Sequence, residues 1–373
     1  MPCDWLCSYD TQRFVHIRST SAACLQYLLQ IAVVAYVIGW VIIYRHGYQD
    51  MEVPVSTVTS KLKGVAFYRD NDSSSSGGVS VWDAADYVIP PEEENAFFIV
   101  TNFIPTANQS RSTCPSTAQC ELPQDCPKTE MDPEGVGVFT GKCINTSCEI
   151  HSWCPLEKEE VPPKPPKLKG AENLTALIKI SVYFPRFNIS RRNIPDDANT
   201  TWMKSCRFST KNNTCPIFRL GDMVAAAGQD FETLATQGGV IGIRVAWFCD
   251  FDYRVSLCRP TYTFRRLDNP SRQSTISPGY NFRYAIYHNQ NERTLIKAYG
   301  IRFEIQVYGK ARKFGIVPTV LNIASGIALL GGVTIICDIF VIYCLGHRHL
   351  YLDKKFKHVD EGSNNLSSYS QMD

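Results

Sequence analysis

Two long apolar runs lie near the ends of the chain. Residues 25–44, LQYLLQIAVVAYVIGWVIIY, contain no charged residue, and residues 316–345 contain a single one, Asp338. A helix rises about 1.5 Å per residue, so a run of this length crosses a hydrocarbon core of about 30 Å. The first run is too long for the apolar core of a signal peptide, and no small-residue cleavage site follows it. We therefore predict two transmembrane helices, at 25–45 and 316–345.

Between the two runs the dominant pattern has a period of two. Large apolar side chains alternate with small or charged ones in residues 241–247, 301–307 and 53–63. This alternation is typical of strands with one buried face. No helical periodicity of comparable strength occurs outside the apolar runs. The pattern predicts a membrane protein with two transmembrane helices per subunit and a large, mainly β extracellular domain between them.

Basic residues flank both runs and predict which side of the membrane each segment occupies. They are Arg13, Arg18, Arg348, Lys354, Lys355 and Lys357. Because basic flanks remain in the cytoplasm, we place residues 1–24 and 346–373 inside the cell and residues 46–315 outside.

Cysteines and glycosylation sequons support this topology. Ten of the fifteen cysteines and seven N-x-S/T sequons fall within residues 46–315. An even number of cysteines in an oxidising compartment predicts disulfides, and the absence of C-x-x-C pairs argues against zinc. The sequons, which predict a glycoprotein, are at Asn71, Asn108, Asn145, Asn173, Asn188, Asn199 and Asn212.

The spacing of the outer cysteines predicts two kinds of bridge. Six of them crowd into residues 114–154, which predicts a cysteine-rich head lobe of loops held by bridges rather than by a core. Two further pairs, at 206/215 and 249/258, are each nine residues apart, which predicts local bridges that close hairpins.

Charge and motif content exclude several functions. Lys plus Arg total 38 and Asp plus Glu total 36, so a net charge of +2 gives no electrostatic reason to expect nucleic acid as a partner. The chain has no H-E-x-x-H, G-x-S-x-G or Walker motif, and only His151 and His288 lie well inside the outer segment. We predict that the protein is not an enzyme, with no catalytic residue, no metal ligand and no cofactor.

Cationic residues at strand spacing point to a binding site instead. Lys61 and Lys63 are two apart in a predicted strand, so their ammonium groups project from the same face. Asn281 and Arg283 have the same spacing, and Lys297 precedes the last outer strand. Like charges held side by side are costly unless an anion bridges them, which would suit a polyphosphate. The alternative is that these are solvated surface cations, as most Lys and Arg residues are.

The second apolar run carries a stripe of mostly small residues. Leu321, Ser325, Ala328 and Gly332 fall on one side of a helix, and Asp338 lies further along. Such a stripe is either a helix-packing face or a pore lining, and an intramembrane Asp is a functional candidate. One chain with two spans cannot enclose a water-filled path, so a pore requires several subunits.

The order and spacing of several motifs closely resemble those of the ionotropic purinergic receptors, which are trimeric cation channels opened by extracellular ATP. The resemblance extends from Tyr9 to about Lys357. The motifs that carry it are TSKLKG at 59–64, DYVIPP at 86–91, the ten-cysteine series, CPIFRLG at 215–221, GYNFRYA at 279–285 and LIKAYGIRF at 295–303.

The resemblance implies an ATP site between neighbouring subunits. The residues that match ATP-binding positions of the family are Lys61, Lys63, Thr175, Leu177, Asn281, Arg283 and Lys297. Of these, Thr175 and Leu177 match the positions that hold the adenine and ribose. Met203 and Ile217 are expected to form an apolar wall on the neighbouring subunit, and Lys179 is another basic position near the site.

The resemblance also implies a disulfide pairing and a gate. The pairs are Cys114–Cys154, Cys120–Cys143, Cys126–Cys148, Cys206–Cys215 and Cys249–Cys258. The closed gate is expected at Leu321, Ser325 and Ala328, so that the second span lines the pore. Residues 9–13 and 351–355 match intracellular motifs of the family.

We therefore expect a plasma-membrane homotrimer, with both termini in the cytoplasm, that conducts Na⁺, K⁺ and Ca²⁺ when ATP binds at intersubunit clefts. ATP is an agonist that is not hydrolysed. The other expected partners are two further subunits of the same or a related chain, the lipid bilayer and the permeant cations. Two alternatives remain: a two-span trimeric channel gated by protons or peptides, and a non-conducting adhesion or scavenger receptor at the cell surface.

Overall fold

The computed structural model describes residues 19–69, 79–157, 160–209, 212–268 and 279–344. It divides into two compact units, one formed by Met1–Asp50 with Lys313–Asp373 and the other by Met51–Arg312. The intracellular motifs at 9–13 and 351–355 and the sequon at Asn71 lie outside the described residues.

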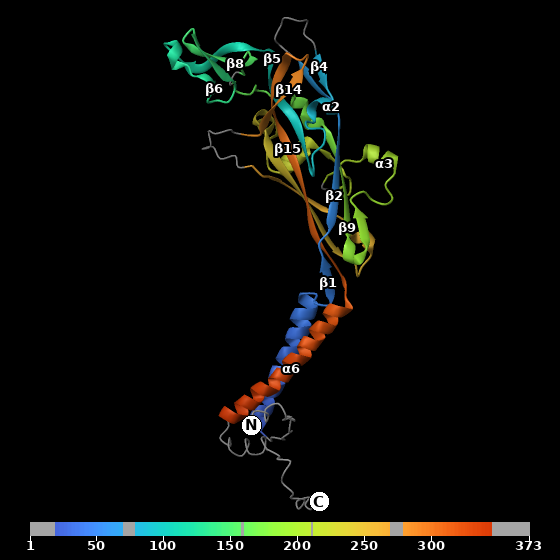
Figure 1. Cartoon of the computed structure of the whole chain (residues 1–373). Coiled ribbons are helices and arrows are strands. Elements are labelled where there is room, and N and C mark those ends of the chain that lie inside the picture. The colour runs from blue at the N-terminus through green and yellow to red at the C-terminus, as the bar shows by residue number, and fades with distance from the viewer. Residues whose placement is uncertain (1–18, 70–78, 158–159, 210–211, 269–278, 345–373) are drawn as a thin grey trace, which may run out of the picture. The chain divides into compact units, whose positions relative to one another are not determined.

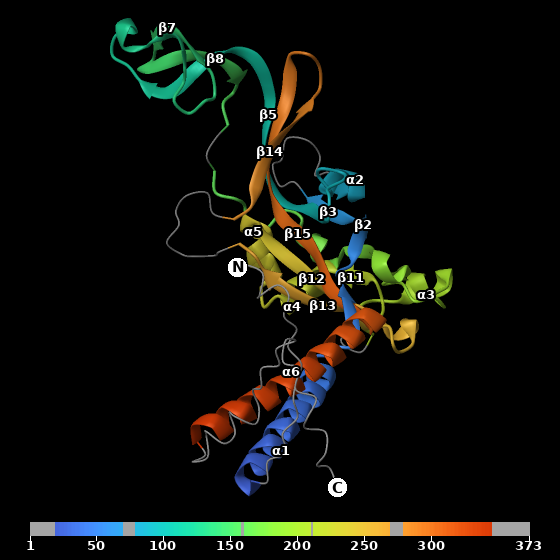
Figure 2. The ribbon, with the colours of Figure 1, turned by 60° about the horizontal axis from the view of Figure 1, so that its bottom comes forward.

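The first unit contains two long apolar helices, which lie side by side (Figure 1, Figure 2). Helix α1 (Thr20–Ala35) continues into a π-helical segment, η1 (Tyr36–Tyr44), and α6 spans Ile316–Cys344. Over 25 and 29 residues respectively, both helices are long and apolar enough to cross a membrane. Gly326 of α6 lets the two helices pack closely, because it has no Cβ. A Cβ at this position would lie only 3.1 Å from the side chain of Val37.

Two hydrogen bonds fasten the start of α6 to the turn that follows η1. Asn322 Nδ2 donates to the carbonyl oxygen of Gly47 at 2.7 Å, and Thr319 Oγ1 donates to that of Tyr48 at 3.2 Å. A Cβ on Gly47 would approach Asn322 Nδ2 to 3.0 Å, so the glycine leaves room for the contact. The amide of Asn322 is thereby paired within a mostly apolar helix.

The second unit is built mainly on a nine-stranded sheet. The strand order is β13-β12-β15-β5-β8-β7-β6, and β1 and β14 also pair with β15. Strands β12 and β15 run parallel, whereas β15 pairs antiparallel with β5 and with β14. The strands are β1 (Gln49–Glu52), β5 (Ala96–Gln119), β6 (Lys128–Met131), β7 (Val138–Ile144), β8 (Ser147–Cys154), β12 (Gly239–Asp250), β13 (Thr261–Arg266), β14 (Asn281–Tyr287) and β15 (Glu292–Phe314).

A four-stranded sheet has β9 at its centre. Strand β2 pairs antiparallel with β9 along one edge (Figure 1), and β10 and β11 pair with β9 along the other. The bounds are β2 (Val55–Lys63), β9 (Thr175–Phe184), β10 (Ile189–Arg192) and β11 (Ile217–Arg219). A separate two-stranded ribbon consists of β3 (Ala66–Arg69) and β4 (Val79–Trp82).

Short helices connect the strands, although the periodicity predicts none there. The α-helices are α2 (Ala84–Tyr87), α3 (Thr200–Ser205), α4 (Leu220–Ala226) and α5 (Phe231–Gln237). The 3₁₀ helices are η2 (Pro123–Asp125), η3 (Lys169–Asn173), η4 (Pro185–Phe187) and η5 (Val255–Leu257). The side chains of Asp83, Asn199 and Asp230 cap α2, α3 and α5. Helices this short cannot display an amphipathic stripe, which is why alternation alone misses them.

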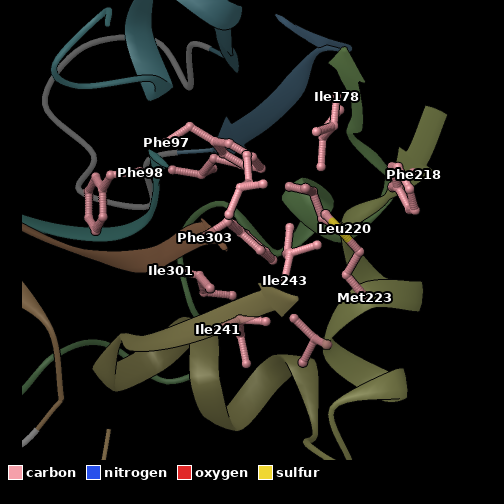
Figure 3. Packing of buried hydrophobic residues seen from close by; sticks show 14 of the residues in the cluster. Phe97, Phe98, Ile178, Phe218, Leu220, Met223, Ile241, Ile243, Ile301 and Phe303 are labelled. Atoms are coloured by element: carbon pink, nitrogen blue, oxygen red, sulfur yellow. The ribbon is translucent and has the colours of Figure 1, made fainter. Parts of the chain in front are cut away.

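Buried apolar side chains from both sheets and from α4 form one core (Figure 3). The rings of Phe97 on β5 and Phe303 on β15 stack with centroids 5.0 Å apart. Ile241 and Ile243 of β12 are fully buried, as the alternating pattern predicts. Burying each such side chain contributes about 1.5–3 kcal/mol. This core therefore holds in place the strands that carry the candidate site.

The cysteine-rich head lobe is a small sheet with its own core, so the prediction of a loop-rich lobe without a core is wrong. Strands β6, β7 and β8 pair with the end of β5. Phe139 and Ile150 pack against Cys120, Cys126 and Cys148. Disulfide sulfur is apolar enough to pack in a core, so the bridged cysteines form part of this core as well as linking its strands.

The structure contains the five disulfides that the resemblance implies, with Cα–Cα distances from 5.0 to 6.0 Å. They are Cys114–Cys154, Cys120–Cys143, Cys126–Cys148, Cys206–Cys215 and Cys249–Cys258. The last two are local, and Cys249–Cys258 closes a hairpin as predicted, because it bridges the connection between the antiparallel strands β12 and β13. Cys206–Cys215 does not, since Cys206 directly follows α3.

Candidate ligand-binding site

Three neighbouring strands bring predicted site residues onto one face of the four-stranded sheet. In the β2–β9 pair, Lys61 lies opposite Leu177 and Lys63 lies opposite Thr175. In the β9–β11 pair, Arg219 lies opposite Thr175. Directly opposed residues of antiparallel strands project from the same face, and the residues between them contribute to the core. We call Lys61, Lys63, Thr175 and Leu177 the lysine half-site.

The two lysines of this half-site carry charges that no described acidic side chain neutralises. Lys61 and Lys63 are exposed, and neither takes part in an ion pair within the described ranges. The hydroxyl of Thr175 donates to the carbonyl oxygen of Lys63 at 3.3 Å. After Lys63 the chain turns at Gly64, where φ is +130° and a Cβ would lie 2.6 Å from the side chain of Leu174. Two cations without a described acidic partner thus lie on the same face of β2.

The remaining predicted residues lie on the nine-stranded sheet, and we call them the arginine half-site: Asn281, Arg283 and Lys297. Arg283 of β14 lies directly opposite Lys297 of β15. Arg283 Nε donates to Glu157 Oε2, and Lys297 Nζ lies 3.6 Å from Glu157 Oε1. The Glu157 side chain is 17% exposed, and limited contact with water strengthens such attraction. One carboxylate thus holds two cations that an anionic ligand would otherwise bridge.

The two half-sites are separate within one chain. They belong to different sheets, and no described hydrogen bond or ion pair joins a residue of one to a residue of the other. That a triphosphate binds residues of both half-sites, contributed by two copies of the chain, stays a prediction.

Ile217 corrects one expectation. It lies opposite Leu177 in the β9–β11 pair, beside the lysine half-site of its own chain. The expectation that Ile217 forms a wall on the neighbouring subunit is therefore wrong, because strand register places it next to Leu177. Lys179 is exposed further along β9. Met203 is half-buried in α3, and its contact with a neighbouring subunit stays a prediction.

Sequon asparagines are accessible wherever the structure describes them. Asn212 is half-buried, and the exposed ones are Asn108, Asn145, Asn173, Asn188 and Asn199. Asn173 adjoins the lysine half-site, because Thr175 completes its sequon. Asn173 Oδ1 accepts hydrogen bonds from Arg219 Nε at 3.1 Å and from Nη2 at 2.8 Å. Glycosylation of these residues stays a prediction.

The predicted gate residues lie on an uncovered part of α6. Leu321, Ser325 and Ala328 are exposed, whereas the buried residues of this helix are Gly326, Val333 and Val341. These three residues are therefore not covered by the residues that the structure describes. Their role as a gate stays a prediction.

Sequence reasoning missed two residues of this region, Glu157 and Arg219. Glu157 is one of 36 acidic residues, and only the fold shows that it reaches Arg283. Arg219 lies within the CPIFRLG motif at 215–221, and this motif could have identified Arg219 as a candidate site residue. Its hydrogen bond with Asp222 raises the pKa of the Arg219 guanidinium further.

Three cysteine sulfurs in the head lobe approach one another as metal ligands do. They belong to Cys120, Cys126 and Cys148. All three are in disulfides, so none offers the thiolate that a metal needs. Among the residues that the structure describes, no other group of three or more His, Cys, Asp or Glu has ligand spacing.

The chain is similar to known proteins of one family. A family model described as ATP P2X receptor matches residues 7–358. P2X purinoceptor 4 of Mus musculus is 45% identical over 377 residues, which cover 97% of this chain and 96% of that protein. P2X purinoceptor 5 of Homo sapiens is 43% identical over 377 residues, covering 96% of this chain and 84% of that protein.

Two solved structures have the same fold. One is an invertebrate P2X receptor from the Gulf Coast tick in the presence of ATP and Zn²⁺, with a TM-score of 0.74 and 40% identity over 85% of this chain and 99% of that one. The other is the chicken ATP-gated P2X7 receptor channel with the competitive antagonist TNP-ATP, with a TM-score of 0.74 and 37% identity over 86% of this chain and 99% of that one.

Proposed function

Because the chain belongs to the P2X receptor family, we propose that its lysine half-site and the arginine half-site of a neighbouring subunit together bind extracellular ATP. The chain is a subunit of a trimeric, ATP-gated cation channel of the plasma membrane. Within it, residues 25–45 and 316–345 span the membrane, residues 46–315 are extracellular, and 1–24 and 346–373 are cytoplasmic.

Each proposed contact follows from the chemistry of the side chain. The triphosphate is bound by Lys61, Lys63, Arg283 and Lys297, and a guanidinium can donate two parallel hydrogen bonds to a phosphate. The amide of Asn281 donates to a phosphate oxygen. The hydroxyl of Thr175 and the apolar side chain of Leu177 hold the adenine and ribose.

Glu157 makes binding at the arginine half-site an exchange of anions. Its carboxylate pairs with Arg283 and Lys297, and ATP must displace it to reach them. A triphosphate carries more negative charge than one carboxylate and can reach Lys63 of the next subunit at the same time. Exchange therefore replaces a contact within one subunit by a bridge between two, which draws the half-sites together.

Closure of the site acts on the pore through β15. Lys297 lies on this strand, which ends at Phe314, and α6 begins at Ile316. ATP binds more tightly to the closed cleft, so it shifts the trimer toward the conformation in which the three α6 helices separate at Ser325. Na⁺, K⁺ and Ca²⁺ then move down their gradients. ATP leaves unchanged, because it is an agonist and no hydrolytic motif accompanies the site.

The observation that carries this proposal is the exposed, unneutralised pair Lys61 and Lys63 in register with Thr175. The test is whole-cell current during rapid ATP application to cells that express the chain. We expect an inward cation current that reverses near zero millivolts. In Lys63→Ala, at equal surface level, the half-activating ATP concentration should rise at least about tenfold, because a charged contact is lost.

Lys164→Ala, which removes an exposed lysine outside both half-sites, is the matched control and should respond as wild type does. Wild-type ATP sensitivity in a well-expressed Lys63→Ala receptor would refute the phosphate role of Lys63.

A further inference from the structure

We propose that Arg219 is a positioning residue for the adenine end of the ATP site and that it acts through the side-chain oxygen of Asn173. The inference rests on the proposed function, because it assigns Thr175 to the adenine. Arg219 is the last residue of β11 and lies directly opposite Thr175, the first residue of β9. Asn173 precedes Thr175 by two residues, so whatever holds Asn173 also determines where β9 begins.

The guanidinium of Arg219 is shared among three acceptors. Its Nε and Nη2 both donate to Asn173 Oδ1, at 3.1 Å and 2.8 Å. Nη2 also donates to Glu172 Oε1 at 2.9 Å, and Nη1 donates to Asp222 Oδ1 at 3.0 Å. Because the donors of a guanidinium have fixed directions, this set of contacts defines one orientation of Asn173.

Neighbouring residues support the same arrangement. Gly221 leaves room for Glu172, because a Cβ on this glycine would lie 2.6 Å from Glu172 Cγ. The backbone N–H of Leu220 donates to the carbonyl oxygen of Leu174 at 3.0 Å, and both side chains are buried. The end of η3, the start of β9 and the end of β11 are thus joined by side chains and backbone alike.

Arg219 shares a sheet face with Lys63, but its surroundings do not suit a third phosphate contact. The carboxylates of Glu172 and Asp222 already neutralise its charge. Lys61 and Lys63 have no such partners among the described residues. A phosphate would have to displace two carboxylates to reach Arg219, whereas the lysines are free. The role that fits Arg219 is to position the strand.

The same geometry lets Asn173 carry a glycan beside the nucleotide. A glycan bonds to Nδ2 and leaves Oδ1 able to accept hydrogen bonds. Arg219 occupies Oδ1, and the nitrogen lies on the other side of the amide group. The amide can therefore be glycosylated on one side while Arg219 holds the other, so a glycan on Asn173 is compatible with the contact from Arg219.

The test uses whole-cell currents from the full-length receptor with ATP and, separately, with CTP, which shares the triphosphate and ribose but has another base. In Arg219→Gln and in Asn173→Ala, the half-activating ATP concentration should rise about tenfold, because charged hydrogen bonds to the strand start are lost. The half-activating CTP concentration should rise less, so the preference of the receptor for ATP over CTP should fall. Surface level is measured in parallel by biotinylation.

Asn173→Asp distinguishes the loss of the acceptor oxygen from the loss of the glycan. Aspartate keeps an acceptor for Arg219 but cannot be glycosylated. We expect Asn173→Asp to rescue most of the ATP preference that Asn173→Ala loses. Arg192→Gln, which removes another arginine of the same sheet and its ion pair with Asp196, is the matched control.

Three outcomes would overturn the inference. They are wild-type base preference in Arg219→Gln at normal surface level, an equal shift for ATP and CTP, and Asn173→Asp as defective as Asn173→Ala. Lys63→Ala is measured in the same series. If Lys63→Ala keeps its ATP sensitivity, the proposed function fails. If Lys63→Ala loses it and the Arg219 and Asn173 variants do not, only this inference fails.

Discussion

At the scale of single residues, Glu157 is a competitor of the ligand that the chain itself supplies. It pairs with Arg283 and Lys297, the two cations that ATP is proposed to reach in this subunit. The free energy of separating these ion pairs is subtracted from the free energy of ATP binding. The affinity of the site is therefore set in part by a residue that does not touch the nucleotide.

Glu157→Gln should make the receptor more sensitive to ATP. Glutamine keeps the size and hydrogen-bonding capacity but removes the charge that ATP must displace. We expect the half-activating ATP concentration to fall about three- to tenfold, since a charged hydrogen bond is worth roughly 1.5–3 kcal/mol and only part of it is lost. Dose–response curves for whole-cell current measure this shift. Glu160→Gln, an exposed acid nearby, is the control, and a rise in the half-activating concentration of Glu157→Gln would contradict the argument.

Asp268 links the start of β12 to the end of β13. Its Oδ1 accepts from the N–H of Val240 at 2.9 Å and from Arg266 Nε at 3.0 Å, and Oδ2 accepts from Arg266 Nη2 at 2.7 Å. Burial raises the pKa of the Asp268 carboxyl, but the hydrogen bonds from Arg266 and Val240 outweigh burial and lower it below the usual 3.8. A carboxyl whose pKa is lower in the folded state stabilises the fold above its unfolded pKa. That contribution to stability disappears as the pH falls through the pKa that the carboxyl has in the folded state.

Asp268→Asn should therefore lower the melting temperature of detergent-solubilised receptor at neutral pH. The difference from wild type should shrink below about pH 4, where the wild-type carboxyl also takes up a proton. Asp197→Asn, an exposed acid on the neighbouring sheet connection, serves as the control and should show no such dependence. A difference that is the same in acid and at neutral pH would show that charge is not what Asp268 contributes.

At the scale of elements, the start of α6 is tied to the turn after η1 by the side chain of Asn322. Asn322→Leu removes the amide that donates to the carbonyl oxygens of Gly47 and Pro318, so we expect a lower melting temperature of the solubilised receptor. The loss should be about 1 kcal/mol, the usual size for one hydrogen bond between membrane helices. Thr334→Val is the control, since the hydroxyl of Thr334 donates to Gly331 of its own helix and to no other residue that the structure describes. Equal melting temperatures of Asn322→Leu and Thr334→Val would argue that the hydrogen bond from Asn322 to Gly47 does not stabilise the receptor.

Alternation and apolar length were enough to predict the long elements, because each leaves a regular mark on the sequence. Helix α6 covers residues 316–344 of the run 316–345, and residues 241–247 and 301–307 fall inside β12 and β15. The same period of two correctly predicts that Lys61 and Lys63 share a face. The resemblance also placed Thr175 and Leu177 in the site, and strand register sets them opposite Lys63 and Lys61. Side chains that reach the site only through the tertiary fold leave no regular mark on the sequence, which is why Glu157 and Arg219 were missed and Ile217 was misplaced.

At the scale of the whole molecule, the separation of the half-sites has a consequence for mixed trimers. Cells that express only Lys63→Ala, or only Arg283→Ala, should respond weakly to ATP. Co-expression should restore part of the current, because an Arg283→Ala subunit still offers its lysines to the intact arginine of a Lys63→Ala neighbour. The control is co-expression of Lys61→Ala with Lys63→Ala, which damages the same half-site twice. If the first mixture recovers no more current than the second, the two half-sites do not come from different subunits.

The continuity of β15 also bears on how quickly the channel can respond. Lys297 and Phe314 belong to one unbroken strand, and a single residue, Gly315, separates that strand from α6. No loop on this route has to become ordered before the helix is displaced. We therefore expect collective movement of preformed elements, which takes microseconds to milliseconds, to limit opening, rather than a slower folding step. Such a receptor is expected to follow brief pulses of its agonist.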